Sequence, residues 1–439
     1  MEKAHIHTFG CQMNEHDSQR IATILRREGY ILTDNPKEAD LIMVNTCSVR
    51  ENPENKVYSL LGRLGRIKKR RPDLIIGVAG CVAQQEGEGI LKRVKEVDLV
   101  LGTDNIFNLP EALIQVKTGN RAVFLDWLPR EKNIQNFIPD DELKAGIVEG
   151  CKAYIAITKG CNNYCTFCIV PRTRGKLVSR DLENILEEAR DVISKGAKEI
   201  QILGQNVNSY QAGNVDFYSL LKSIANLEGL NRLRFTSPHP NDWNNRLSDL
   251  MASHPVICNH IHLPFQAGSD RILKLMKRGH SSTDYLNKID YLKKKIPNIS
   301  VTTDIIVGFP GETEAEFLET LGIVEKTRFS QIYAFVYSSR PGTKAQEFDD
   351  NVEKEVKEER LQRLLEVQAP IQSEILDSKL GNKEQVLIDS AHPRERGVMT
   401  GRTDGNLPVA VDDFRLDIGE LIDVRITGRK PHSLIGSKI

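Results

Sequence analysis

The feature that most constrains this chain is a loop with three cysteines, Cys161, Cys165 and Cys168, in the spacing C-x3-C-x2-C. Iron–sulfur clusters are held by cysteine thiolates and normally take four of them. A loop with three thiolates can hold three irons of a 4Fe-4S cube, which leaves the fourth iron open to a small molecule. The alternatives are a zinc site without its fourth ligand or three unrelated core thiols, but no further Cys or His follows at zinc-like spacing.

A second set of cysteines closes three predicted strands. These cysteines are Cys11, Cys47 and Cys81. The apolar runs before them are residues 4–9, 41–46 and 74–80, and the helical stretches after them are residues 18–28, 55–69 and 84–94. The carboxyl ends of the strands of an open parallel sheet line one crevice. We therefore expect the three thiols to converge on one site, although a free cysteine is often only a small buried hydrophobe.

Composition limits the class of protein. A length of 439 residues predicts about three domains, and a 40% hydrophobic content suffices for packed cores. Lys plus Arg and Asp plus Glu number 60 each, so a polyanion must be held by local patches. Eight cysteines, six of them in two metal-like triplets, suit a reducing compartment, and we interpret Cys151 and Cys258 as structural thiols. With neither a signal peptide nor a membrane-length apolar run, we expect a cytoplasmic protein that has no membrane partner.

The pattern of strands and helices predicts an α/β protein in three parts. Residues 1–127 form an open parallel α/β sheet domain that holds the second cysteine set, and residues 128–146 form a polar linker. Residues 147–379 alternate strand and helix and predict a partial (β/α)6 barrel, with its site on loops at the carboxyl ends of the strands. Its strands are expected at residues 153–158, 199–203, 232–236, 260–264, 300–307 and 332–337. Residues 380–439 predict a small β-barrel, with strands at 385–389, 397–401, 407–411 and 421–426.

Several strings resemble the motifs of one family. They are TFGCQMN (8–14), NTCSVR (45–50), GCVAQ (80–84), the stretch 160–175 around the cysteine loop, LGQNVN (203–208), HLPFQAGS (262–269) and GFPGET (308–313). With these strings the chain resembles the radical S-adenosylmethionine (SAM) methylthiotransferases essentially end to end, and its last part resembles a TRAM domain. The string Cys11-Gln12-Met13-Asn14 is similar to the branch that modifies tRNA, whereas the ribosomal-protein branch usually reads Cys-Pro-Lys-Asn.

The resemblance implies a transferase that inserts sulfur and a methyl group at carbon 2 of N6-isopentenyladenosine next to the tRNA anticodon. The C-x3-C-x2-C loop would hold a 4Fe-4S cluster whose open iron binds SAM, and SAM would be split into methionine and a 5'-deoxyadenosyl radical. This radical would take the hydrogen from an adenine carbon that ordinary acids and bases cannot attack. A second 4Fe-4S cluster, on Cys11, Cys47 and Cys81, would supply sulfur that a second SAM methylates.

Further residues are candidates for contact with SAM. They are Phe167, Gly204, Gln205, Asn206, Gly308, Gly311 and Glu312. Phe167 would cover the SAM adenine or only pack the loop. Related enzymes often carry Gly-Gly-Glu where this chain has Gly204-Gln205-Asn206, which leaves the ligand of the SAM amine open. The last three residues follow a strand where glycine permits close backbone approach, or form a plain turn. No catalytic residue beyond the cluster ligands is predicted.

Basic patches are candidate RNA contacts. One patch lies at the end of a helix, where cations also suit the helix dipole, and the other lies in a barrel that is not basic overall but whose class binds single strands. The residues are Lys68, Lys69, Arg70, Arg71, Arg394, Arg396, Arg402, Arg425, Arg429 and Lys430. The implied partners are tRNA bearing N6-isopentenyladenosine beside the anticodon and an electron donor such as flavodoxin or ferredoxin; the sulfur donor is not predicted.

Three other functions remain open at this point. The chain could methylthiolate a ribosomal-protein side chain, or threonylcarbamoyl-adenosine in tRNA. In another class, it could be a non-catalytic iron–sulfur protein that binds RNA. Cleavage of SAM by the reduced protein separates the enzymes from the binding protein, and the identity of the modified molecule separates the enzymes from one another.

Overall fold

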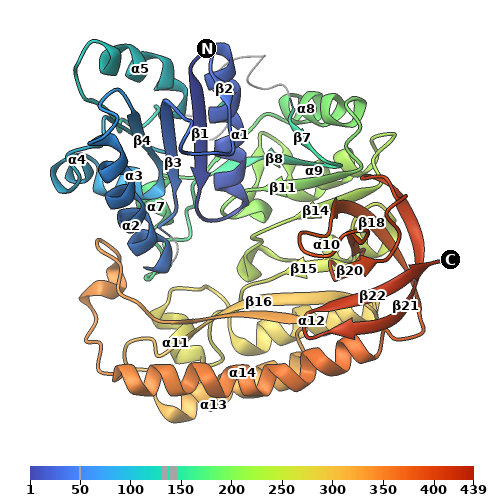
Figure 1. Cartoon of the computed structure of the whole chain (residues 1–439). Helices are drawn as coiled ribbons and strands as arrows, with labels where there is room; N and C mark the ends of the chain where they lie inside the picture. Colours follow the sequence, from blue (N-terminus) through green and yellow to red (C-terminus); the bar gives the residue numbers. More distant parts are fainter. Residues whose placement is uncertain (49–50, 131–136, 139–145) are drawn as a thin grey trace.

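The computed structural model describes residues 1–48, 51–130, 137–138 and 146–439, with side chains except those of residues 51–55. Its strands form a blue amino-terminal sheet, a green to orange barrel and a red carboxyl-terminal barrel in Figure 1. Most of the predicted linker at 128–146, and two residues of the string at 45–50, lie outside the described residues.

The amino-terminal strands form one six-stranded sheet in the order β2-β1-β3-β4-β5-β6. Every neighbouring pair is parallel, which confirms the predicted open parallel sheet. The strands are β1 (Lys3–Thr8), β2 (Ile31–Leu32), β3 (Leu41–Thr46), β4 (Ile75–Gly80), β5 (Leu99–Leu101) and β6 (Ala122–Phe124). The helices are α1 (Gln12–Arg27), α2 (Glu51–Lys68), α3 (Cys81–Glu86), α4 (Glu88–Arg93) and α5 (Leu109–Lys117). β3 is buried along its whole length, as expected of a central parallel strand.

Two helices of this part differ from the sequence prediction. The first begins at Gln12, directly after Cys11, rather than at residue 18. Its first turns carry polar residues that are buried against the barrel, so hydrophobic periodicity does not reveal them. The stretch predicted as one helix at 84–94 is two short helices, α3 and α4, because Gly87 between them adopts a φ of 54°.

The central strands form two sheets that together make an open barrel. Their orders are β14-β11-β8-β7 and β15-β16-β17, and an isolated parallel bridge between Leu233 and Ile257 links them. All six predicted strands are present and parallel to their neighbours. They are β8 (Lys152–Ala156), β11 (Glu199–Leu203), β14 (Arg232–Phe235), β15 (His260–His262), β16 (Ser300–Val307) and β17 (Gln331–Val336), with β7 (Val148–Glu149) antiparallel at one edge.

Helices cover the outside of this barrel. They are α8 (Leu182–Ser194), α9 (Phe217–Ala225), α10 (Asn245–Ser253), α11 (Asp270–Leu275), α12 (Ser282–Lys295), α13 (Glu314–Thr327) and α14 (Lys354–Asp377). Short elements lie in the loops: β9 (Thr158–Lys159), α7 (Val170–Thr173), β10 (Val178–Ser179), β12 (Gln211–Ala212) and β13 (Val215–Asp216). The long helix α14 packs on β17 and leads into the last barrel (Figure 1). Among the described residues, no helix combines the length and apolarity needed to cross a bilayer.

The carboxyl-terminal strands close into a five-stranded barrel in the order β18-β19-β20-β22-β21. They are β18 (Lys383–Ala391), β19 (Met399–Thr403), β20 (Pro408–Val411), β21 (Leu421–Lys430) and β22 (Ser433–Lys438). The sequence predicts four of these strands and misses β22, whose six residues include only Leu434 and Ile435 as large apolar side chains. Closure depends on β22, because it pairs with both β20 and β21.

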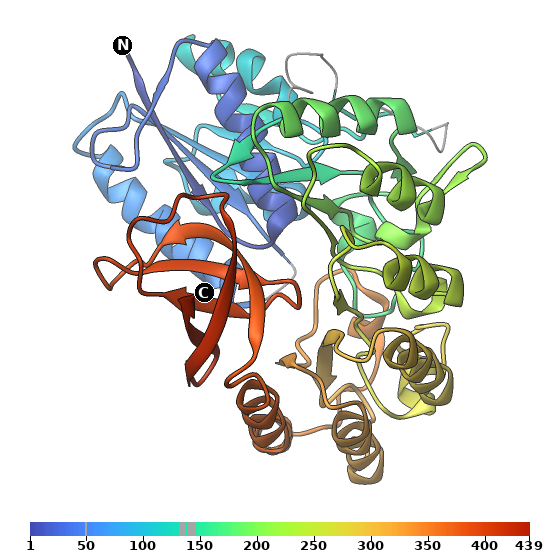
Figure 2. The same ribbon diagram turned by 90° about the vertical axis from the view of Figure 1, so that its right-hand side faces the viewer.

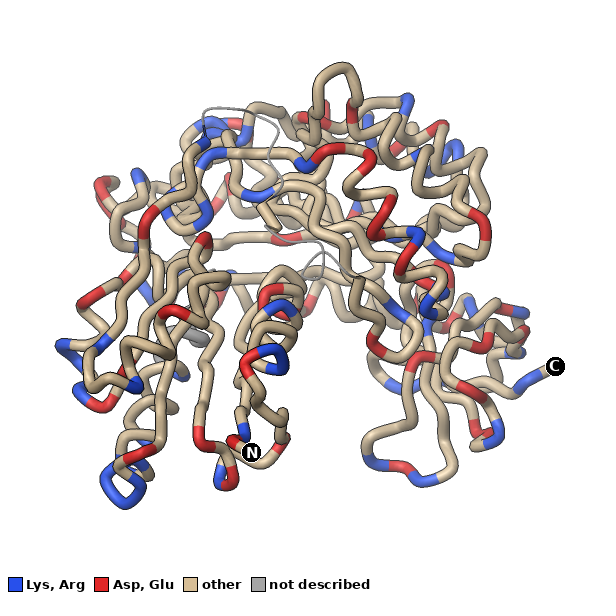
Figure 3. The backbone as a smooth tube through the Cα atoms, turned by 90° about the horizontal axis from the view of Figure 1, so that it is seen from above, with Lys and Arg blue, Asp and Glu red and all other residues tan. Residues whose placement is uncertain are grey.

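Two buried arginines fasten this last barrel to the central one. Arg232 on β14 donates to the carbonyl oxygens of Arg402 at 2.6 Å and Gln385 at 2.9 Å. Arg234 donates to the carbonyls of Asp404 at 2.8 Å and Thr403 at 2.9 Å, and its Nε is 2.9 Å from the Glu199 carboxylate. The small barrel therefore sits against the edge strand β14, and Figures 2 and 3 show it on the same side of the central barrel as the amino-terminal sheet.

Replacing Arg234 by Met tests this attachment. The substitution leaves the buried Glu199 carboxylate without its cation and removes the Arg234 donor from the Asp404 carbonyl, so we expect a loss of about 3–5 kcal/mol in the free energy of unfolding. Urea unfolding measures the loss, and limited proteolysis between α14 and β18 reports release of the small barrel. The matched control is Arg246→Met at an exposed pair with Asp216, where about 1 kcal/mol or less is expected. Equal, small effects of the two substitutions would contradict the attachment.

Candidate active site

Three of the six predicted ligand cysteines directly follow a glycine in the left-handed region. The φ values are 120° at Gly10, 93° at Gly80 and 81° at Gly160. A Cβ on Gly10 would collide with the side chain of Cys47, and one on Gly80 would collide with the backbone of Thr46. The chain needs glycine at both positions because the loops at the ends of β1, β3 and β4 approach without room for a side chain.

The second cysteine set comes together at these strand ends. A hydrogen bond with Cys47 lowers the pKa of the Cys11 thiol to about 6. Burial alone would lower the pKa of the Arg174 guanidinium. The neighbouring Asp17, Cys81 and Cys11 instead raise this pKa well above its ordinary value. Arg174 is thus near both Cys11 and Cys81. The structure places the three thiols in one neighbourhood, where the sequence prediction expects them.

Arg174 reaches this neighbourhood from the barrel. Its side chain is buried, and Nη2 donates to Oδ1 of Asn14 at 2.9 Å and to Oδ2 of Asp17 at 2.7 Å. Nη1 is buried and has no hydrogen-bond partner within the part of the chain that the structure describes. A buried N–H without an acceptor is costly. A free guanidinium donor beside three thiols therefore fits a site for an anionic, sulfur-rich group such as an iron–sulfur cluster.

The C-x3-C-x2-C loop is fixed on several sides. Its Thr166 donates from Oγ1 to the carbonyl of Leu275 at 2.9 Å, and Phe167 is partly buried against an apolar cluster. Arg278 donates from Nη1 to Sγ of Cys165 at 3.4 Å. Burial, together with the neighbouring Cys165 and Cys161, raises the pKa of Cys168 to about 12. Three thiols in mutual electrostatic contact, with one arginine donor, form a ligand set that an added cation would stabilise as thiolates.

Neither cysteine set converges on one point. Among the described residues, no three His, Cys, Asp or Glu side chains are placed to hold a single metal ion. This geometry disfavours a mononuclear zinc site, in which all ligands bind the same ion. In an iron–sulfur cube each thiolate binds a different iron, so the cysteines surround the cluster instead of meeting.

Buried ion pairs join the two cysteine-bearing parts. Arg20 on α1 contacts Glu188 on α8, and Arg180 pairs with the same carboxylate at 2.6 Å. Asp104, after β5, accepts from Lys159 at 2.5 Å and from Arg130 at 2.9 Å. The members of these groups are almost entirely buried. Removing one partner from such a group leaves a buried charge unpaired, so the two parts are held in one relative position.

The candidates at 204–206 lie next to the cysteine loop. A Cβ on Gly204 would overlap Oγ1 of Thr158, so only glycine fits there. Oε1 of Gln205 accepts from the backbone N–H of Gly160 at 2.6 Å, which ties this loop to the residue before Cys161. Nδ2 of Asn206 donates to a neighbouring aspartate, but its Oδ1 is buried and unpartnered in the described part of the chain. Asn206 therefore has an acceptor available for a ligand.

The candidates at 308–312 form a turn after β16. The backbone N–H of Gly308, whose φ is 68°, donates to Glu312 at 2.7 Å, and Gly311 donates to Oδ1 of Asn351 at 2.9 Å. Arg360 on α14 donates to the Glu312 carboxylate at 3.0 Å. Burial raises the pKa of Glu312 to about 7 against these interactions. The carboxylate is thus engaged in fixing the turn to α14.

Most of the predicted RNA-binding cations are engaged by the protein itself. The ion pairs are Lys68 with Asp98, Lys69 with Glu96, Arg71 with Asp40, Arg402 with Asp389, Arg429 with Asp377 and Lys430 with Glu395. Arg425 donates to the carbonyl of Gly381. Arg70, Arg394 and Arg396 have no ion pair among the described residues. Figure 3 shows both signs of charge scattered over the backbone, in keeping with the zero formal net charge.

Sequence reasoning missed the two arginines beside the thiols. Arg174 lies inside the string 160–175 that carries the family resemblance, but nothing in its spacing marks it as a neighbour of Cys11. Arg278 stands over a hundred residues from the loop that it contacts. Asp17 could have been found as an acidic residue on the apolar face of a helix, a position that requires a cationic partner.

Solved structures support the fold assigned above. The radical SAM methyltransferase TsrM from Kitasatospora setae superposes with a TM-score of 0.56 at 14% identity over 79% of this chain and 74% of its own. The cobalamin-dependent SAM radical enzyme OxsB superposes with a TM-score of 0.51 at 12% identity, over 85% of this chain and 56% of its own. Residues 155–324 match the radical SAM superfamily. The class that the barrel and its three-cysteine loop define is therefore the radical SAM proteins.

Sequence comparison assigns the chain more narrowly. Residues 3–102 match the uncharacterized protein family UPF0004. A protein of Acetivibrio thermocellus named tRNA-2-methylthio-N(6)-dimethylallyladenosine synthase is 45% identical over 98% of this chain and 90% of its own length. Proteins of the same name from Pelotomaculum thermopropionicum and Hahella chejuensis are 44% and 40% identical over 97% or more of each chain. The chain belongs to the radical SAM methylthiotransferase family that includes these synthases.

Replacing Asp17 by Asn tests the link between the two parts. Burial alone would raise the pKa of Asp17, but Arg174 and His16 hold it far below the ordinary value. Stability from this carboxylate is therefore present above pH 4 and is lost as the pH falls below it. We expect Asp17→Asn to cost about 3–5 kcal/mol at pH 7, and the deficit to shrink at pH 3.

Urea unfolding of parent and variant at both pH values measures this effect. The matched control is Asp249→Asn, at an exposed pair with Lys295, where little change is expected because solvent screens the pair. A deficit for Asp17→Asn that stays constant between pH 7 and pH 3 would show that the pair with Arg174 is not its cause.

Proposed function

We propose that this chain inserts sulfur and a methyl group at carbon 2 of N6-isopentenyladenosine next to the tRNA anticodon, as a radical SAM methylthiotransferase. The observation that carries the proposal is the presence of two separate three-cysteine sets, each beside a buried arginine and each at the carboxyl ends of parallel strands. A sulfur-inserting radical enzyme needs two open-site clusters, one for SAM and one for sulfur. The full-length similarity to curated synthases supports the same reaction.

A cluster on Cys161, Cys165 and Cys168 would supply the single electron that splits SAM, and one on Cys11, Cys47 and Cys81 would supply the sulfur. The residues of the chain position these groups. Arg278 donates to Sγ of Cys165 at the first site, and Arg174 brings its unpartnered Nη1 close to Cys11 and Cys81 at the second. Charge-assisted donors near sulfur stabilise the thiolate form and, with the other hydrogen bonds to sulfur, set the potential of a bound cluster.

The SAM pocket is proposed at the carboxyl end of the barrel strands. Phe167 covers the adenine, and Gly204 permits close approach of the ligand to the backbone. We assign the SAM amine to Oδ1 of Asn206, because this buried acceptor has no partner within the described chain. Gln205 holds the loop from behind, through the N–H of Gly160. Gly308, Gly311 and Glu312 contribute through the turn that they form, since Glu312 is bound to Arg360.

The partner is tRNA, and its target adenosine must leave the stack. Enzymes that act on ring atoms of a base extract the nucleotide into a pocket. We propose that residues 1–127 carry the sulfur site, 147–379 the radical site and 380–439 an RNA-binding barrel. A target base placed between the two cysteine sets would be in reach of both, because buried ion pairs fix the first two parts against each other.

Replacing all three cysteines of one set by Ala separates the two sites. The parent should bind roughly eight irons per chain if both clusters are 4Fe-4S. The triple variant at Cys161, Cys165 and Cys168 should keep about half of that iron and lose SAM cleavage. The matched variant at Cys11, Cys47 and Cys81 should keep reductive SAM cleavage but give no methylthio product. Iron assay, 5'-deoxyadenosine formation and nucleoside mass spectrometry report the outcome; thiolation at normal yield by the second variant would refute the proposal.

The prenyl group should decide which tRNA is modified. Each buried methylene contributes about 0.8 kcal/mol, so a five-carbon chain supplies up to about 4 kcal/mol, or roughly a thousandfold in kcat/KM. We expect prenylated tRNA to react, and bare tRNA to react poorly. Parallel assays on prenylated, unprenylated and threonylcarbamoylated tRNA check this. Equal turnover of the unprenylated form, or preference for the threonylcarbamoylated one, would place the chain in another branch of its family.

A further inference from the structure

A cavity of about 900 Å³ opens between the amino-terminal part and the cysteine loop of the barrel. Its lining includes Trp127, Arg130, Tyr164, Ile169, Arg172 and Lys176. Tyr164 and Ile169 belong to or directly follow the loop that carries Cys161, Cys165 and Cys168. The cavity therefore leads to the three-cysteine loop, and a molecule in it would lie beside that site.

Two aromatic rings line this cavity in the open. Trp127 is 43% exposed and Tyr164 is 45% exposed, although large aromatic side chains usually bury most of their surface. Tyr164 also has a φ of 48°, a left-handed conformation that is strained for a residue other than glycine. An exposed ring at a strained position does not stabilise the folded chain. A ligand that stacks on the ring would offset the strain.

Two of the three cations that line the cavity have no carboxylate partner in the described part of the chain. Arg172 and Lys176 are exposed, and neither has an ion pair in the described part of the chain. Arg130 is different, because Asp104 binds it on the buried side. Lys277 adds a further charge, with Nζ 5.9 Å from the centre of the Tyr164 ring. This arrangement contrasts with the cations of the predicted RNA patches, most of which are paired with acids.

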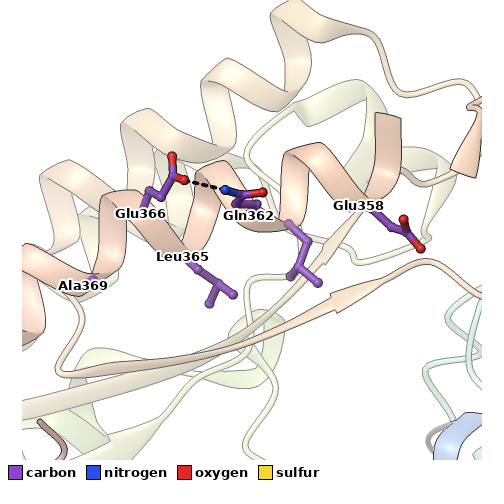
Figure 4. A pocket seen from close by; sticks show the side chains of 6 residues that line it. Glu358, Gln362, Leu365, Glu366 and Ala369 are labelled. Atoms are coloured by element: carbon purple, nitrogen blue, oxygen red, sulfur yellow. Dashed lines mark hydrogen bonds between the residues drawn. The ribbon is translucent and has the colours of Figure 1, made fainter. Parts of the chain in front are cut away.

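Exposed rings interleaved with free cations match the chemistry of a single-stranded nucleic acid. Bases stack on aromatic side chains, and the backbone phosphates contact Lys and Arg. A double helix would not expose the faces of its bases, and the cavity would not have enough room for it. By comparison, the groove on α14 in Figure 4 combines acidic and apolar side chains, Glu358, Leu361 and Glu366 among them, and no cation lines it.

We infer that this cavity binds the single-stranded nucleotides that flank the target adenosine, with bases on Trp127 and Tyr164 and phosphates on Arg172 and Lys176. The inference rests on the proposed function, because it takes RNA to be the substrate. The cavity would then bind the RNA next to the three-cysteine loop through the nucleotides on either side of the extracted base. An acidic electron-donor protein is the other partner that the basic cavity could bind, but exposed rings favour bases over carboxylates.

Binding of a fluorescent RNA stem-loop of anticodon type, without any modified base, to the reconstituted full chain tests the inference. Stacking contributes about 1–3 kcal/mol per base, so Trp127→Ala should weaken binding about 5- to 150-fold, while Trp127→Phe should keep most of the affinity. The control is Tyr291→Ala, which removes another ring that stands near a lysine on α12 and should leave affinity unchanged. Iron content and thermal unfolding are measured on every variant.

Salt dependence tests the phosphate contacts. The double variant Arg172→Ala/Lys176→Ala should reduce the slope of log affinity against log salt by about 1.4, since each single-strand phosphate contact contributes about 0.7. Lys222→Ala/Lys326→Ala, which removes two exposed lysines on α9 and α13, should leave the slope as in the parent.

These outcomes separate the cavity from the proposed reaction. Parent-like affinity and salt slope in the Trp127 and Arg172/Lys176 variants would overturn the inference, whatever the chain does to tRNA. Parent-like RNA binding by these variants, combined with slower reduction by flavodoxin, would also overturn the inference and assign the cavity to an electron donor. Weakened RNA binding in a protein that forms no methylthio product would support the cavity and refute the proposed reaction.

Discussion

Buried ion pairs between helix α1 and the barrel are the interaction on which the rest of the structure depends. Asp17 and Arg174 form one of them, and Arg20 and Glu188 form another. Because α1 begins directly after Cys11, the position of this helix also sets the position of that cysteine. The barrel carries the other cysteine loop. Removing one partner of a buried ion pair is costly, so two cysteine sets encoded 150 residues apart are held in one relative position.

The third part is held by a different kind of contact. Arg232 and Arg234 donate to main-chain carbonyls of the small barrel. Main-chain acceptors are present whatever the side chain, and the contact therefore depends on how the barrel backbone is folded. The missed strand β22 matters for this reason, since without it the barrel does not close. Its attachment to β14 places the small barrel on the same side of the central barrel as the amino-terminal sheet (Figure 3).

Local patterns revealed most of the fold. Apolar runs that end at turns identified the strands of the amino-terminal sheet and of the central barrel. A buried strand requires apolar side chains at successive or alternate positions, and this pattern is visible in the sequence. The failures arise where burial is polar or weak. Helix α1 starts six residues before its prediction because its first turns bury Asn14, His16 and Asp17, and Asn14 and Asp17 both bind Arg174 far along the chain. The break at Gly87 and the short strand β22 leave little trace in hydrophobic periodicity.

The sequence by itself determined the class of chemistry, since three thiols within eight residues must share one loop and three more at strand ends must share one sheet edge. It could not determine which charges would remain free. Arg174 and Arg278 reach the thiols, and Lys68 and Arg429 are neutralised, through contacts between residues distant in sequence. Only the tertiary structure sets those distances. Coulomb interaction and hydrogen bonding depend on the distances, and residue spacing along the chain does not record them.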